Sequence, residues 1–99
     1  MRAYRFAREA EAAFEHQIDY LISQHALAAA RAFERRVRSY LRDTVCLFPY
    51  AGTHIAERAI YESWIPGTRL IIWYTVTDQY ENVAMIWHAS QARFEQDGR

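Results

Sequence analysis

The feature that most constrains this chain is a change in the spacing of its apolar residues, which falls between Pro49 and Gly52. Before this point apolar residues recur every three or four positions, the period of an α-helix with one buried face. After it apolar and polar residues alternate, which is the period of a β-strand. Proline and glycine at the boundary are typical of a connection between two kinds of structure. The sequence therefore predicts a helical half followed by a strand-forming half.

The helical half contains two amphipathic segments. The first begins at Glu9 and ends near Gln24 or His25, and its apolar stripe consists of Ala10, Phe14, Ile18, Leu21 and Ile22. The second covers about residues 27–46, and its apolar stripe consists of Ala30, Phe33, Val37, Leu41 and Val45. Each stripe should face a core. Together the two segments predict a helical hairpin.

Alternating residues predict the strands. The predicted strands cover residues 3–7, 58–65, 69–77 and 82–88, with a turn at Pro66-Gly67. Residues 89–99 are polar and are expected to form a short helix or a loose tail. We therefore predict an α+β fold of order β-α-α-β-β-β over residues 1–99, one domain in which the helical hairpin packs on an antiparallel sheet.

The charged residues exclude several classes of function. Twelve basic residues balance twelve acidic ones, and every basic residue is arginine. A neutral protein lacks the broad positive field that drives binding to nucleic acid, so direct binding of nucleic acid is not expected. The histidines have no metal-site spacing, and we expect no metal and no cofactor.

Cysteine usage and apolar runs bear on where the protein acts. Cys46 is the only cysteine, which excludes an intrachain disulfide and fits the reducing cytoplasm. The longest strongly apolar run, residues 70–74, is far shorter than the ~20 residues that span a bilayer. The sequence therefore predicts a cytoplasmic protein that does not act in a membrane.

Several short segments, taken in order, carry a resemblance to a known family. They are residues 7–14 (AREAEAAF) with 18–21 (IDYL), residues 48–52 (FPYAG), residues 65–68 (IPGT) leading into 70–76 (LIIWYTV), and residues 83–88 (VAMIWH). In this order and spacing they resemble the toxins of the ParE/RelE superfamily, and ParE-like toxins most closely. The first segments resemble the family's first helix, and the last resembles its final strand, which ends in histidine. The similarity covers nearly the whole chain.

The resemblance implies the toxin of a type II toxin–antitoxin system. Such a protein inhibits DNA gyrase by binding it, without catalysis of its own, and a ParD-like antitoxin neutralises it. A homodimer or a toxin–antitoxin hetero-oligomer is the implied assembly. We expect the target to contact Arg58, Arg69, Trp87, His88, Gln91 and Arg93. We expect the antitoxin to contact Phe14, Ile18, Trp64 and Trp73.

The sequence departs from the family pattern at Ala7-Arg8, Ala13, Tyr61 and Gln91, and two alternatives stay open. One is a RelE-like nuclease that cleaves messenger RNA on the ribosome. This reaction needs a base, an acid and cations around the phosphate, for which the chain offers Arg58, Arg69, Arg93, His88 and Tyr61 but no lysine. The other is a degenerate relative that binds only the antitoxin.

The charged residues of the two predicted helices form stripes of opposite sign. Four arginines of the second helix share one stripe, namely Arg31, Arg35, Arg38 and Arg42. We expect them to pair with an acidic stripe on the first helix made of Glu11, Glu15 and Asp19, the alternative being a surface for an acidic partner or a nucleic-acid backbone.

Tryptophans occur once on each of three predicted strands, at Trp64, Trp73 and Trp87. Alternation along its strand places Trp73 on the side opposite to Leu70 and Ile72. A sheet covered by helices on one side only would leave apolar area on the other. We therefore expect part of the sheet to be available to another protein.

Overall fold

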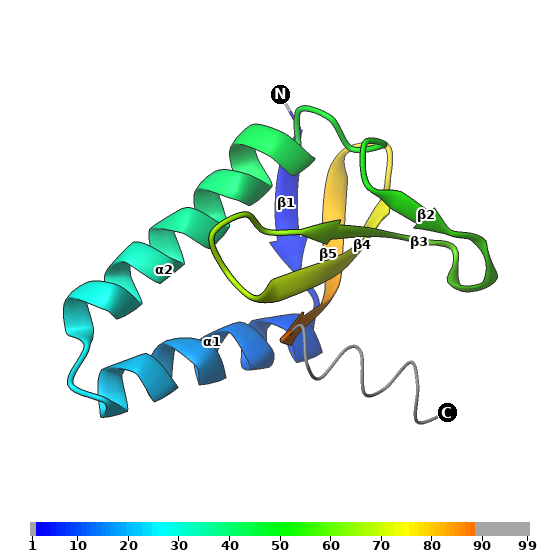
Figure 1. The fold of residues 1–99 in the computed structure, drawn as a ribbon. Helices are drawn as coiled ribbons and strands as arrows, with labels where there is room; N and C mark the ends of the chain where they lie inside the picture. Colours follow the sequence, from blue (N-terminus) through cyan, green and yellow to red (C-terminus); the bar gives the residue numbers. More distant parts are fainter. Residues whose placement is uncertain (1, 89–99) are drawn as a thin grey trace.

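The computed structural model describes residues 2–88. The elements in chain order are β1 (Ala3–Phe6), α1 (Arg8–Ser23), α2 (Leu27–Tyr40), η1 (Leu41–Val45), β2 (Thr53–Ile55), η2 (Ala56–Arg58), β3 (Ile60–Trp64), β4 (Leu70–Val76) and β5 (Tyr80–His88). The two long helices form a hairpin beside a twisted sheet (Figure 1). Within the described residues, none of these helices has the length and apolar character needed to cross a membrane.

The five strands form one sheet in the order β1-β5-β4-β3-β2. Strands β2 to β5 pair antiparallel, whereas β1 pairs parallel with β5. The predicted α+β class is therefore confirmed, with a mixed sheet in place of a wholly antiparallel one. A four-residue strand can pair in either direction, so the sense of β1 is set by the place of α1, which packs on β5.

Several element boundaries differ from the prediction for local reasons. Strand β2 was not predicted, because three residues are too few to show alternation. The strand expected from residue 58 begins at Ile60, since Ala56–Arg58 form a turn of 3₁₀-helix and Ala59 is left-handed, with φ 54°. Strand β5 begins two residues early, at Tyr80, because β1 pairs with this end.

The second helix also changes its winding. Its α-helical part ends at Tyr40, and the following residues form a π-helical turn in which the amide of Cys46 donates to the carbonyl of Leu41 at 2.9 Å. In an α-helix each four-residue step rotates a side chain by about 40° away from its stripe. The wider turn removes this drift, and Leu41 and Val45 both remain buried.

The core lies between the helical hairpin and one face of the sheet. Its buried side chains come from both helices and from β4 and β5, and include Phe14, Val37, Leu41, Ile72, Tyr74, Val83 and Ile86. Alternation in β4 turns Leu70, Ile72 and Tyr74 toward the helices, as predicted. Ile71 and Trp73 are therefore left on the opposite face.

Tyr74 joins the core to the segment that follows η1. Its hydroxyl donates to the carbonyl of Pro49 at 2.7 Å. Gly52 lies so close that a Cβ there would be 2.8 Å from both the Tyr74 hydroxyl and the carbonyl oxygen of Glu62. This approach explains why glycine stands at the end of the FPYAG segment. Burial raises the pKa of Tyr74 to about 12.

The most buried charge in the described part of the chain is Glu81 on β5, which is 0% exposed. Arg2 forms an ion pair with it. The same guanidinium donates to the carbonyls of Asp78 at 3.1 Å and Tyr80 at 3.2 Å. Burial and the neighbouring Glu81 raise the pKa of the Cys46 thiol to about 11. A buried carboxylate is tolerated here because a cation fixed by several carbonyls lies against it.

The expected pairing between the two helices is wrong. Within residues 2–88, the ion pairs join Arg2 to Glu81, Arg38 to Glu34 and Arg42 to Asp43. None joins α1 to α2. The Arg38 guanidinium instead donates a hydrogen bond to the hydroxyl of Tyr4 and lies over the ring of Phe14. Side chains on one stripe can pair along their own helix or reach inward over the core, which helical spacing alone does not distinguish.

We predict that Arg2→Ala lowers the free energy of unfolding more than Arg5→Ala does, because only the former leaves the buried Glu81 carboxylate uncompensated. Urea unfolding at neutral pH measures both. The double variant Arg2→Ala/Glu81→Leu should recover part of the loss, since it removes the charge along with its partner. Equal losses for the two single variants would contradict this account.

We predict a loss of stability at alkaline pH that depends on Tyr74. Because folding raises its pKa from 10.0 to about 12, this contribution is fully present below pH 10 and disappears as the pH rises to about 12. The free energy of unfolding should fall by about 2 kcal/mol over that interval. Urea unfolding of Tyr74→Phe should lack this component and show a loss of about 1 kcal/mol at neutral pH. Tyr50→Phe, at an exposed position, is the control and should keep the wild-type pH dependence.

Candidate functional site

The sheet face turned away from α1 and α2 carries two cross-strand rows of side chains, which we call the open face. Strand register aligns them as Glu62–Trp73–Met85 and Trp64–Ile71–Trp87. Residues directly opposite one another on paired strands share a face and lie close together. Three strands that are separate in the sequence thus bring all three tryptophans onto one surface.

Trp73 is the centre of this surface. Its ring lies edge-on to that of Trp87, with centroids 5.1 Å apart. Its indole nitrogen donates to a carboxylate oxygen of Glu62 at 2.8 Å. The guanidinium carbon of Arg58, which belongs to η2, lies 5.1 Å from the Trp73 ring centroid. An aromatic pair contributes about 0.5–1.5 kcal/mol, and a cation over a ring contributes a similar amount. These contacts hold Trp73 in one orientation.

The three tryptophans differ in their exposure. Trp64 is 55% exposed, whereas Trp73 and Trp87 are half-buried. Ile71, between Trp64 and Trp87 in their row, is buried. The indole nitrogen of Trp87 is buried and donates no hydrogen bond to any described residue. The open face is therefore an ordered aromatic surface with one large ring presented to solvent, as binding surfaces often have.

The residues expected to contact the target lie in two places. Trp87 belongs to the open face, and Arg58 lies over the Trp73 ring of that face. Arg69 and His88 instead line a cavity of about 210 Å³ on the helical side of the sheet, where α1, α2 and the start of β4 meet. Gln91 and Arg93 lie outside the described residues. Within residues 2–88, these side chains therefore do not form one site.

The residues expected to contact the antitoxin are also divided. Trp64 and Trp73 lie on the open face beside Arg58 and Trp87. Phe14 is 2% exposed in the core, and Ile18 packs partly buried against that core. Phe14 and Ile18 lie on the helical side of the sheet, whereas Trp64 and Trp73 lie on the opposite side. Of these four residues, only the two tryptophans could contact the same partner surface.

Sequence reasoning missed three members of the open face, namely Glu62, Ile71 and Met85. Alternation along the predicted strand places Ile71 on the same side as Trp73, so Ile71 could have been predicted from the sequence. Glu62 and Met85 could be added only from the register, which places both opposite Trp73. Register depends on contacts between distant segments, which a single strand does not reveal.

The two charged groups at the centre of the open face both contact Trp73. The Glu62 carboxylate accepts the Trp73 indole hydrogen, and the Arg58 guanidinium lies over the same ring. Among residues 2–88, neither group is hydrogen-bonded to a histidine or a second carboxylate that would form an acid–base pair. Within the described residues, no cluster of histidine, cysteine and carboxylate side chains has the composition of a metal site.

Comparison with known proteins identifies the fold. No family model matches the chain, and no curated protein does. Among solved structures, a chain of the chromosomal ParDE TA (toxin–antitoxin) system from P. aeruginosa superposes with a TM-score of 0.75. The match covers 89% of this chain and 96% of that one, at 11% sequence identity. The predicted ParE-like resemblance is thus confirmed at the level of the fold.

We predict that Trp64 dominates the emission that a polar quencher such as acrylamide can reach. Its large exposed fraction admits the quencher, whereas Trp73 and Trp87 are half-buried. Trp64→Phe should remove most of the quenchable emission, and Trp73→Phe should leave it in place. Three equally shielded tryptophans would contradict the existence of an open face.

Proposed function

We propose that this chain is the toxin of a type II toxin–antitoxin system, that it inhibits DNA gyrase by binding, and that a ParD-like antitoxin neutralises it in the cytoplasm. The likeness of its fold to a chain of a ParDE system, over nearly the whole length of both chains, carries this proposal. The segments that resemble ParE toxins in the sequence support it independently.

The composition of the open face favours binding over RNA cleavage. A nuclease needs cations free to hold a phosphate in its charged transition state. Here Arg58 lies over Trp73, and the guanidinium carbon of Arg5, on β1, lies 4.4 Å from the ring centroid of Tyr80. Aromatic rings and an arginine are also the residue types that contribute most to protein interfaces. A protein target therefore fits this face better than RNA does.

The positions of the two predicted sets of contact residues support neutralisation by the antitoxin. Trp73, assigned to the antitoxin, touches Arg58 and Trp87, which are assigned to the target. A partner that covers one set must cover part of the other. We therefore propose that antitoxin and gyrase exclude each other from the open face, so that inhibition ends when the antitoxin binds.

The test uses purified chain with gyrase and supercoiled DNA, and measures accumulation of cleaved DNA. Wild-type protein should increase cleavage, and Trp73→Ala should reduce the apparent affinity by about tenfold or more, because its ring lies at the centre of the patch. Arg8→Ala changes an exposed arginine on α1 and serves as the control with no effect. The product of a neighbouring reading frame, added first, should prevent cleavage.

Two results would contradict the proposal. Cleavage of translated messenger RNA, without an effect on gyrase, would make the chain a RelE-like nuclease. Binding of the neighbouring product with neither activity would make it a relative that retains only the antitoxin interaction. Induction in a bacterium with and without that reading frame shows whether growth inhibition accompanies either result.

A further inference from the structure

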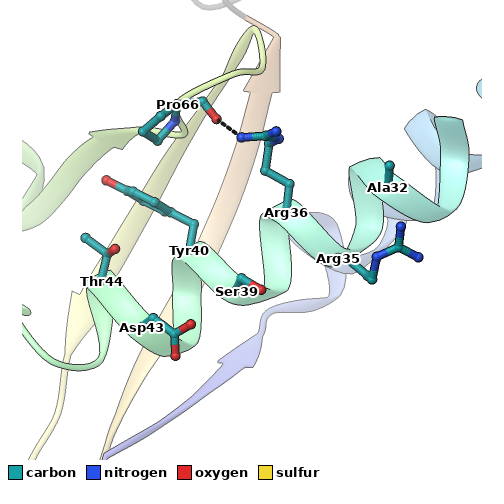
Figure 2. Close-up of a pocket in the computed structure, with 8 residues that line it drawn as sticks. All are labelled: Ala32, Arg35, Arg36, Ser39, Tyr40, Asp43, Thr44 and Pro66. Atoms are coloured by element: carbon teal, nitrogen blue, oxygen red, sulfur yellow. Dashed lines mark hydrogen bonds between the residues drawn. The ribbon is translucent and has the colours of Figure 1, made fainter.

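A second surface, separate from the open face, lies along the outer side of α2. It is a groove of about 590 Å³ between this helix and the turn that joins β3 to β4 (Figure 2). We call it the α2 groove; its lining residues are Ala32, Arg35, Arg36, Ser39, Tyr40, Asp43, Thr44 and Pro66. Figure 2 shows Arg36 and Tyr40 directed toward the turn and Arg35 directed away from it.

The segment that forms the groove carries an excess of positive charge. Residues 31–43 contain five arginines and two acidic residues, Glu34 and Asp43. Glu34 pairs with Arg38 and Asp43 pairs with Arg42, so that within residues 2–88 three arginines have no carboxylate partner, namely Arg31, Arg35 and Arg36. The acidic stripe of α1 pairs with none of these within the described residues. The net charge of zero therefore hides a local surplus of cations on α2.

The groove is held in shape by contacts to the turn. One guanidinium nitrogen of Arg36 donates to the carbonyl of Pro66 at 3.5 Å. Gly67 lies beneath this side chain, since a Cβ there would be 2.7 Å from the same nitrogen, and its φ is 78°. Tyr40 forms a hydrogen bond with Ser63 on β3. Arg36 is thus positioned before any ligand arrives, and its remaining N–H groups are available.

We propose that the α2 groove binds an acidic helical segment of a partner protein, in addition to whatever the open face binds. Arg35 and Arg36 both line the groove and have no carboxylate partner among residues 2–88, so a partner helix that carries a row of carboxylates can supply one to each. Arg31, one helical turn before Arg35, continues the positive charge beyond the groove. Guanidinium groups bind carboxylates with two parallel hydrogen bonds. The Tyr40 ring, Ala32 and Pro66 supply apolar contact between the charges.

A protein segment fits this groove better than a nucleic acid does. Three unpaired arginines on one helix are few for a phosphate backbone, whose binding strengthens with each phosphate neutralised. Asp43 lies in the groove, where it would repel a continuous row of phosphates. A protein segment can place its carboxylates at Arg35 and Arg36 and leave neutral residues opposite Asp43.

The test measures binding of a short alanine-based peptide with glutamate at every fourth position to the purified full chain. The same peptide with glutamine in place of glutamate is the matched probe, and a short oligothymidylate tests for phosphate. NMR amide shifts locate the site. We expect saturable binding of the glutamate peptide that shifts amides of α2 and of the turn at Pro66, and that is lost near ~1 M salt.

Arg35→Gln should weaken this binding by about tenfold. Arg8→Gln, which removes the same charge from α1, should change it less than about twofold. Among residues 2–88, Arg35 forms no hydrogen bond or ion pair, so urea unfolding of both variants should match the wild type. The proposal is overturned by equal binding of the glutamine peptide, by equal effects of the two substitutions, by tighter binding of oligothymidylate, or by no binding at about millimolar peptide.

Discussion

The pairing of β1 with β5 is the contact on which the rest of this structure depends. It carries Arg2 to the buried carboxylate of Glu81 and places Phe6 opposite Val83. The amide of Ala7, the residue before α1, donates to the carbonyl of Val83 at 2.8 Å. Helix α1 therefore starts at a defined point on the sheet, and the hairpin that it begins must lie over the face that Phe6 and Val83 share. One short parallel pairing thus decides which side of the sheet becomes the core.

The aromatic open face is a consequence of this one-sided coverage. The central strand β4 must present apolar residues to the helices, because that side of the sheet forms the core. Its sequence also places apolar residues on the opposite side. Trp73 lies on the side of the sheet away from α1 and α2. Its contacts with Trp87, Glu62 and Arg58 stabilise its position there. Such a surface is ordered before a partner arrives, so a partner loses little conformational entropy in ordering it. The proposed antagonism between antitoxin and gyrase follows from the compactness of this one patch.

Most of the charged residues in the described part of the chain lie on the helices, whereas the exposed apolar residues of the open face lie on the sheet. The chain is neutral overall, yet the acidic residues of α1 and the unpaired arginines of α2 remain apart, with no ion pair between the helices in the described part of the chain. A neutral protein built in this way is not drawn to every polyanion, since its distant field cancels. It still presents a local cationic groove at short range, where screening by salt is weakest. The open face and the α2 groove therefore suit partners of different chemistry.

The sequence by itself determined the elements and their faces. The stripes that contain Phe14 and Val37, and the alternation of Ile72 with Trp73, reflect burial on one side, which is a property of neighbouring residues in the chain. The parallel sense of β1, the existence of β2, the partners of Arg38, and the meeting of Arg58 with Trp73 were decided only by the tertiary structure. These depend on register and on contacts between residues far apart in sequence, and many arrangements of such contacts are compatible with the same local pattern. Arg69 and Trp87 show the consequence, because they were predicted to act together and lie on opposite sides of the sheet.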